Sequence, residues 1–157
     1  MSGAPVADRD AYIADLADLI TASPSSFHAV AEVSRRLDAA GFERLEEAEP
    51  WRNSASGRRR YVVRDGSVVA WVVPAGAGPT TPYRVVGAHT DSPGFMLKPR
   101  PGSAAHGWLQ ARVEVYGGPL LNSWLDRELE LAGRLVTHDG AEHLVRTGPF
   151  LRIPQLA

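Results

Sequence analysis

The chain has 157 residues, of which 17 are basic and 18 acidic, so its net charge is −1. This balance argues against a nucleic-acid partner, because such binding needs a concentrated basic surface that displaces counterions. The sequence contains no cysteine, which excludes disulfides, thiol nucleophiles and zinc sites built on thiolates. Any metal site must therefore use His, Asp and Glu side chains.

The sequence carries no recognisable targeting or membrane signal. Its first residues lack the basic segment and the apolar segment of an export signal. No stretch approaches the ~18 uninterrupted apolar residues that a membrane helix needs. We therefore expect a cytoplasmic protein without a membrane partner.

Two helices are predicted over most of residues 9–40. Apolar residues recur at helical spacing in the first helix, opposite an acidic face, and Pro24 ends it. Ser25 or Ser26 is suited to cap the second helix, and Gly41 is suited to end it in a left-handed conformation.

The pattern then changes to the period of two that is typical of strands. Residues 61–63 and 68–73 flank Asp65-Gly66, a two-residue hairpin signal. Residues 83–88 form a short apolar run of the kind found in buried strands. We interpret residues 99–107, rich in proline and glycine, as a linker. Further strands are predicted over 108–116, 131–138 and 142–146, the last two joined at a second hairpin signal, Asp139-Gly140.

The only basic run is Arg58-Arg59-Arg60, directly before a strand. We interpret it as a solvated loop or an edge strand rather than a nucleic-acid patch, since the chain as a whole is close to neutral. Neither a glycine-rich phosphate loop nor a Gly-x-Ser-x-Gly elbow occurs in the sequence.

His89-Thr90-Asp91 directly follows the apolar run 83–88. Open α/β sheets place their ligands at the carboxyl ends of strands. An imidazole there can bind a divalent cation through one nitrogen, while the carboxylate of Asp91 holds the other ring N–H and fixes the tautomer. A His-x-Asp motif is common, so its surroundings decide its meaning. We interpret His28 as a capping or packing residue and the remaining histidines as surface residues: His106, His138 and His143.

These surroundings resemble a known family. Residues 89–99 are similar to the first metal-ligand segment of the aspartyl aminopeptidase family, also called M18. Three more stretches agree with the family in order and spacing, and the resemblance covers nearly the whole chain. These stretches are residues 23–30, 113–134 and 152–157.

The resemblance implies a cytoplasmic metallo-aminopeptidase that binds two zinc ions, acts on peptide substrates and forms a homo-oligomer, commonly a dodecamer. It implies that His89 is a zinc ligand and that Asp91 is the catalytic-site carboxylate that orients it. The implied fold class is α/β (α+β as truncated). Residues 1–98 would be the N-terminal part of the metallopeptidase domain, and residues 99–157 would begin an inserted β-rich oligomerisation domain.

By the same resemblance, the family's other metal ligands and its general base lie downstream of the residues matched here. We therefore expect this chain to be inactive alone and prone to associate, with an acidic N-terminal substrate residue as a family expectation only. Asp126 lies in a matched motif, where a structural or interface role is expected. Two alternatives remain: a non-catalytic short relic that binds intact subunits, and an unrelated hydrolase that uses His89 and Asp91 with a serine.

Overall fold

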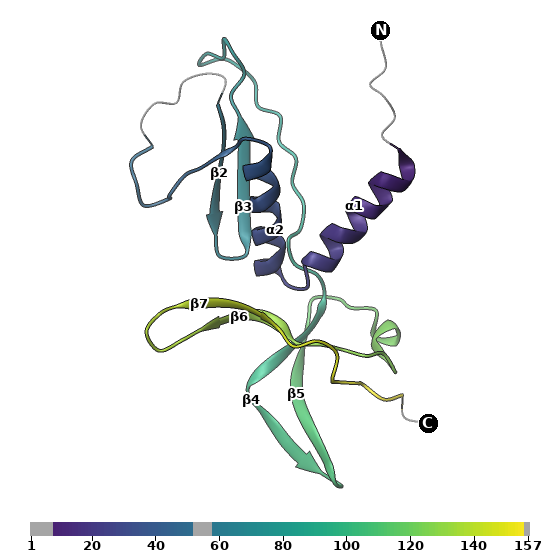
Figure 1. The fold of residues 1–157 in the computed structure, drawn as a ribbon. Helices are drawn as coiled ribbons and strands as arrows, with labels where there is room; N and C mark the ends of the chain where they lie inside the picture. The colour runs from purple at the N-terminus through teal and green to yellow at the C-terminus, as the bar shows by residue number, and fades with distance from the viewer. Residues whose placement is uncertain (1–7, 52–57, 156–157) are drawn as a thin grey trace. The chain divides into compact units, whose positions relative to one another are not determined.

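The computed structural model describes residues 8–51 and 58–155. Its internal contacts divide the chain into two units. The first unit runs to Asp91 and includes Ala132–Arg146, and the second comprises Ser92–Leu131 and the residues from Thr147 onward. The first unit contains helices and strands (Figure 1), in agreement with the predicted mixed class.

Both predicted helices are present in the first unit, as α1 (Arg9–Ala22) and α2 (Ser26–Ala39). Asp8 and Ser25 are their N-caps, and each side chain accepts a backbone N–H of the first helical turn. Gly41 follows α2 with φ of +77°, which confirms the predicted left-handed end. Over the described ranges, no helix is long and apolar enough to cross a membrane.

A three-stranded sheet follows α2. Its middle strand β2 (Arg59–Arg64) pairs in parallel with β1 (Glu43–Arg44) and antiparallel with β3 (Ser67–Val72). Asp65 and Gly66 form the turn between β2 and β3, and Asp65 has φ of +49°. This geometry confirms the hairpin that the Asp-Gly pair predicts.

The prediction that the arginine run is solvated is wrong for Arg60. This residue is 5% exposed and lies on the middle strand of the sheet, not on an edge strand. Its guanidinium donates a hydrogen bond from Nε to Glu43 Oε2 at 3.2 Å, and Glu43 is its register partner on β1. A carboxylate supplied by the neighbouring strand therefore balances the buried positive charge.

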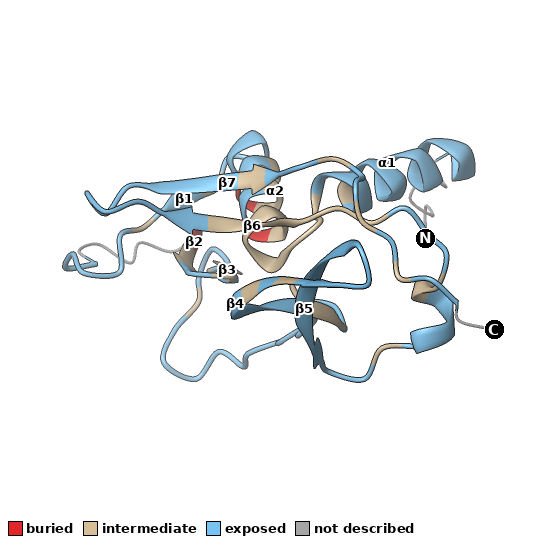
Figure 2. Ribbon diagram, turned by 90° about the horizontal axis from the view of Figure 1, so that it is seen from below, coloured by how far each residue is buried: buried red, intermediate tan, exposed pale blue. Residues whose placement is uncertain are grey.

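The packed centre of the first unit lies between α2 and β2, as Figure 2 shows. Among the described residues, Val30 and Tyr61 are the buried hydrophobic side chains, at 3% and 1% exposure. The Tyr61 hydroxyl donates to Asp38 Oδ1 at 2.7 Å, which satisfies its polar end. Burial, followed by the bond to Asp38, raises the pKa of Tyr61 and keeps the hydroxyl a donor.

A second hairpin belongs to the same unit. It consists of β6 (Ala132–Val136) and β7 (Glu142–Arg146), joined by a turn in which Gly140 has φ of +83°. The strands predicted here are confirmed, with β6 somewhat shorter than expected. These residues group by contact with the first unit, and the assignment of residues 99–157 to an inserted domain stays a prediction.

The second unit is built on a long hairpin of β4 (Gly94–Ala105) and β5 (Trp108–Tyr116). The prediction of a linker over residues 99–107 is therefore wrong, because most of these residues lie in β4. Pro99 and Pro101 fall in an irregular stretch of β4, where the register with β5 shifts. A proline is tolerated there because it need not donate to the ladder.

The remainder of the second unit contains a short 3-10 helix, η1 (Leu121–Trp124). Trp124 packs edge-on against Phe95, with ring centroids 5.1 Å apart. Single bridges then pair Leu125 with Ile153 and Leu129 with Leu151. These contacts fasten the last described residues to the segment that follows η1.

Residues 83–88, predicted as a buried strand, form neither a strand nor a buried segment. Tyr83, Val85 and Val86 are 88–96% exposed. A strand that is apolar on both faces needs a paired strand on each side. The described sheet ends at β3, and no described strand pairs with this segment. The prediction is therefore wrong for this chain.

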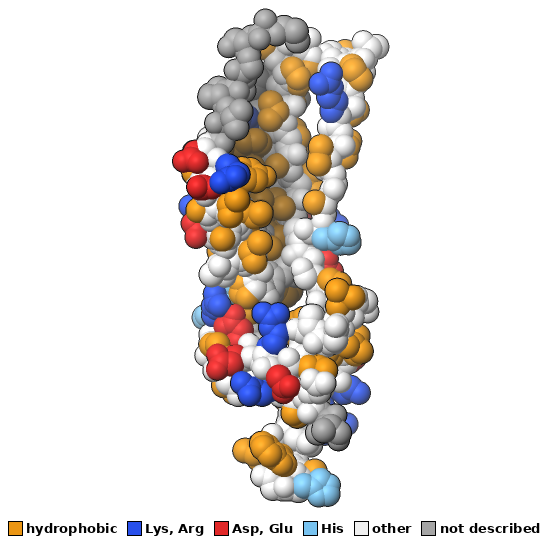
Figure 3. All heavy atoms as spheres, turned by 90° about the vertical axis from the view of Figure 1, so that its right-hand side faces the viewer, with side chains coloured by type: hydrophobic (Ala, Val, Ile, Leu, Met, Phe, Trp, Pro, Cys, Tyr) orange, Lys and Arg blue, Asp and Glu red, His pale blue; other side chains and the backbone are white. Residues whose placement is uncertain are grey.

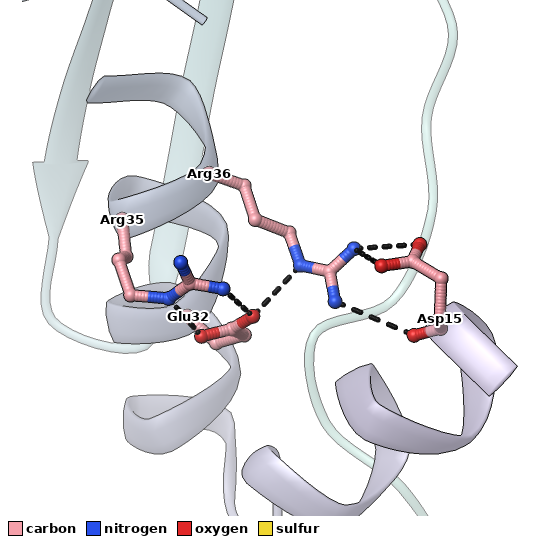
Figure 4. Close-up of polar contacts among 4 residues, drawn as sticks. All are labelled: Asp15, Glu32, Arg35 and Arg36. Carbon is pink, nitrogen blue, oxygen red and sulfur yellow. Dashed lines mark hydrogen bonds and ion pairs between the residues drawn. The ribbon is translucent and has the colours of Figure 1, made fainter. Parts of the chain in front are cut away.

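An ion-pair network joins α1 to α2 (Figure 4). Arg36 donates from Nη1 to both carboxylate oxygens of Asp15 at 2.8 Å, and from Nε to Glu32 at 2.7 Å. Arg35 also donates to Glu32. Hydrogen bonds from Arg35 first, and then from Arg36, lower the pKa of Glu32 to about 2.

This network predicts a specific loss of stability in acid. Because folding lowers the Glu32 pKa, its stabilising effect is complete above its ordinary pKa of 4.5 and disappears as the pH falls toward about 2. In denaturant unfolding followed by circular dichroism, the unfolding free energy of the unmodified chain should fall more across this window than that of Glu32→Gln. The control is Glu49→Gln, an exposed glutamate after β1; if its pH profile flattens as much as that of Glu32→Gln, the assignment is wrong.

The exposed run 83–88 predicts self-association. Hydrophobic side chains lie open at the surface (Figure 3), and an unpaired apolar segment is a template for pairing with another chain. Val86→Lys should shift the chain toward monomer in light scattering coupled to gel filtration. Val136→Lys, an exposed valine on β6, is the matched control and should leave the association unchanged. Equal effects of the two variants would contradict the role given to residues 83–88.

Candidate metal-ligand segment

His89 and Asp91 lie together at the end of the extended segment in the first unit. His89 Nδ1 is 3.3 Å from Asp91 Oδ1, a long hydrogen bond. The His89 side chain is 91% exposed and that of Asp91 40% exposed. The predicted pair is thus adjacent, but the sheet strand that was expected to precede it is missing.

The arrangement suits a metal-binding imidazole. With its proton on Nδ1, His89 donates to Asp91 and keeps a lone pair on Nε2, the nitrogen that a zinc ion would bind. The carboxylate then fixes the tautomer and the orientation of the ring. The pair can therefore offer a cation one ring nitrogen together with a carboxylate that orients the ring.

Thr90, between these two residues, attaches the segment to the sheet. Its hydroxyl donates to the backbone carbonyl of Gly66 at 2.6 Å, and its side chain is half-buried. Gly66 lies in the turn between β2 and β3, so the attachment is to the end of a regular hairpin. Sequence reasoning gave Thr90 no role, because a threonine in a short motif carries no signal for a partner 24 residues away.

Within residues 8–51 and 58–155, no group of three or more His, Asp or Glu side chains is placed to hold a metal ion. A catalytic zinc site uses about three protein ligands. The described residues therefore do not by themselves bring together a complete ligand set of this kind.

The other histidines are placed as expected. His28 Nδ1 lies 2.8 Å from the Ser25 hydroxyl, and the same hydroxyl accepts the His28 N–H, so His28 takes part in capping α2. His106, His138 and His143 are exposed, and His106 forms the β4–β5 turn with φ of +52°.

Asp126 has a structural role in the second unit. Its backbone is left-handed, with φ of +55°. Its N–H donates to Ile153 O at 2.8 Å, and its carboxylate accepts the Gln155 N–H at 3.2 Å. Asp126 thus holds the last described residues in place, in line with the structural alternative drawn from the sequence.

Two of the sequence stretches that carry the family resemblance meet at Arg134. Its guanidinium carbon lies 4.3 Å from the centre of the Phe27 ring, a cation–π contact between β6 and α2. Arg134 Nη1 also donates to Asp65 Oδ1 at 2.9 Å and to Glu142 Oε1 at 3.1 Å. One arginine thus connects α2, the β2–β3 turn and the β6–β7 hairpin.

The sequence profile of the aminopeptidase I zinc metalloprotease family, M18, matches residues 19–157. The chain therefore belongs to the M18 family. The description of this family names zinc, in agreement with the predicted cofactor.

Individual relatives agree with this assignment. A probable M18 family aminopeptidase 2 of Streptomyces avermitilis is 54% identical over 154 residues, which cover 98% of this chain and 35% of the relative. The crystal structure of yeast aminopeptidase 1 superposes with a TM-score of 0.81 at 29% identity, over 95% of this chain and 37% of that one. A Saccharomyces cerevisiae structure described as the mApe1 dodecamer has a TM-score of 0.74 at 31% identity, over 88% and 34%.

These similarities confirm the predicted α/β class and the M18 resemblance. The chain spans about a third of the length of the relatives it matches. This coverage agrees with the prediction that the chain corresponds to an N-terminal portion.

We expect the 157-residue chain to retain less than one equivalent of zinc. A single imidazole is too few ligands for tight binding, and the described residues bring no three-ligand group together. The measurement is the zinc content of the purified chain after gel filtration in metal-free buffer, by atomic emission. Retention of a full equivalent would contradict the expectation and would require ligands not recognised here.

Proposed function

We propose that this chain is the N-terminal part of a zinc-dependent aminopeptidase of the M18 type, which releases N-terminal residues from peptides. The observation that carries the proposal is the His89–Asp91 pair, with Nδ1 and Oδ1 3.3 Å apart. The pair lies inside the region that the family profile matches. Its position next to Thr90, which is bonded to the β2–β3 turn, gives the ligand a defined attachment.

In this proposal each residue has a specific role. His89 holds a zinc ion through Nε2, and Asp91 keeps the proton on Nδ1 and orients the ring. Zinc, when bound, acts as a Lewis acid on water and on the scissile carbonyl. The donor types fit zinc, since an imidazole with a carboxylate behind it is a common zinc ligand. Because one protein ligand is too few, the other ligands come from the rest of the complete protein.

Several finer features rest on the family resemblance. They are two zinc ions per active site, a preference for acidic N-terminal residues, a cytoplasmic location and a homo-oligomeric assembly. The likeness to a structure described as a dodecamer supports the last of these. The division into a peptidase part over 1–98 and an inserted β-rich part over 99–157 belongs to the same proposal.

The proposal predicts that activity and metal depend on the complete protein. The 157-residue chain should not hydrolyse an aspartyl or glutamyl peptide above the buffer rate. In the complete protein, His89→Ala should abolish zinc binding at the site, and Asp91→Asn should lower zinc affinity about 10–100-fold. Zinc content and peptide hydrolysis are measured on the same preparations.

The matched control is His138→Ala, an exposed histidine in the β6–β7 turn, which should retain zinc and activity. Robust hydrolysis by the 157-residue chain alone would refute the proposal. A reading frame that stops after residue 157 would instead favour the short non-catalytic alternative. Sequencing the source DNA past the codon for residue 157 distinguishes the proposed aminopeptidase from the short non-catalytic alternative.

A further inference from the structure

The segment that carries His89 is attached at Thr90. The residues before it, 83–88, belong to no sheet and are exposed. At Thr90 the side chain becomes half-buried, and its hydroxyl donates to Gly66 O over 2.6 Å. Because His89 and Asp91 flank this residue, the bond limits the directions in which their side chains can point.

The acceptor of this bond is held firmly in place. Gly66 packs so closely against the start of α2 that a Cβ added to it would lie 2.7 Å from Ser26 Oγ. The preceding Asp65 adopts φ of +49°, which fixes the turn and the orientation of the peptide groups around it. The Gly66 carbonyl therefore belongs to a turn that packs closely against the start of α2.

Arg134 also contacts this turn. It donates to Asp65 at 2.9 Å while its guanidinium lies over Phe27 of α2, and Glu142 of β7 provides a second carboxylate. The arginine side chain is only 23% exposed, so these interactions are less screened than those of an ordinary surface pair. A planar guanidinium can lie flat over a ring while its edge donates to the carboxylates, a geometry that a lysine ammonium does not reproduce.

We propose that Thr90 and Arg134 are positioning residues for the metal-ligand segment. Arg134 holds the β2–β3 turn through Asp65, the turn presents the Gly66 carbonyl, and Thr90 bonds to that carbonyl and so orients His89 and Asp91. This inference takes one element from the proposed function, namely that His89 binds a zinc ion. The mechanical link between Arg134 and residues 89–91 stands without zinc.

The link is tested first on the 157-residue chain without metal, by the ¹⁵N backbone order parameters of residues 89 and 91. Thr90→Val removes the hydroxyl at nearly constant volume and should lower these values from about 0.85 to below about 0.6. Thr90→Ser restores the hydroxyl and should restore the order. Thr21→Val, which removes an exposed hydroxyl in α1, is the control and should change nothing at residues 89–91.

Arg134 is tested in the same way. Arg134→Gln should lower the order parameters of residues 89 and 91, and Arg134→Lys should lower them in part. The double variant Arg134→Gln/Thr90→Val should have order parameters no lower than those of Thr90→Val alone. An unchanged far-ultraviolet circular dichroism spectrum shows that each variant is folded, and Thr90→Ala replaces Thr90→Val if the latter unfolds. If Thr90→Val and Thr90→Ser have equal order parameters at residues 89 and 91, the role of the hydroxyl is overturned. If the two substitutions of the double variant lower these order parameters additively, the link to Arg134 is overturned.

A second readout separates this inference from the proposed function. In the complete protein, zinc release to a chelator should be about tenfold faster in Thr90→Val than in Thr90→Ser. If His89→Ala leaves zinc release unchanged, the proposed function fails while the order-parameter result stands. If His89→Ala loses zinc and Thr90→Val releases it at the unmodified rate, the positioning role is overturned.

Discussion

The burial of Tyr61 against α2 is the constraint on which the rest of the first unit depends. This ring is the fully buried large side chain of the described residues, and its hydroxyl is satisfied by Asp38 of α2. One residue therefore contributes both apolar contact and a polar bond between helix and sheet. Because β2 is the middle strand, fixing it against α2 also fixes β1, β3 and the β2–β3 turn beside the metal-ligand segment.

Around this small centre, arginine–carboxylate pairs connect the secondary-structure elements. Arg36 joins the two helices, Arg60 joins β2 to β1, and Arg134 joins the second hairpin to α2 and to the turn. Each of these interactions uses the planar, multiply donating guanidinium. The arginine-rich composition, with 16 arginines and one lysine among the basic residues, thus has a structural use.

The sequence predicts local features well and features that depend on distant partners poorly. The caps at Ser25 and Gly41 and the Asp65-Gly66 turn are fixed by neighbouring residues, and all three were predicted. The run 83–88 was predicted as a buried strand, but burial depends on neighbouring strands that the described residues do not provide. The prolines of β4 suggested a linker. They are accommodated by a register shift between β4 and β5, and the residues next to the prolines give no sign of that shift.

The same distinction explains the candidate site. His89 and Asp91 were predicted because they are two residues apart and fall in a recognisable stretch, whereas Thr90 and Arg134 act through partners 24 and 69 residues away. If His89 is a zinc ligand as proposed, it lacks partner ligands among the described residues, just as residues 83–88 lack a described strand to pair with. One additional set of polypeptide segments packed against residues 83–91 would remedy both. The proposed metal site and the unpaired run 83–88 would therefore be completed by the same neighbouring segments.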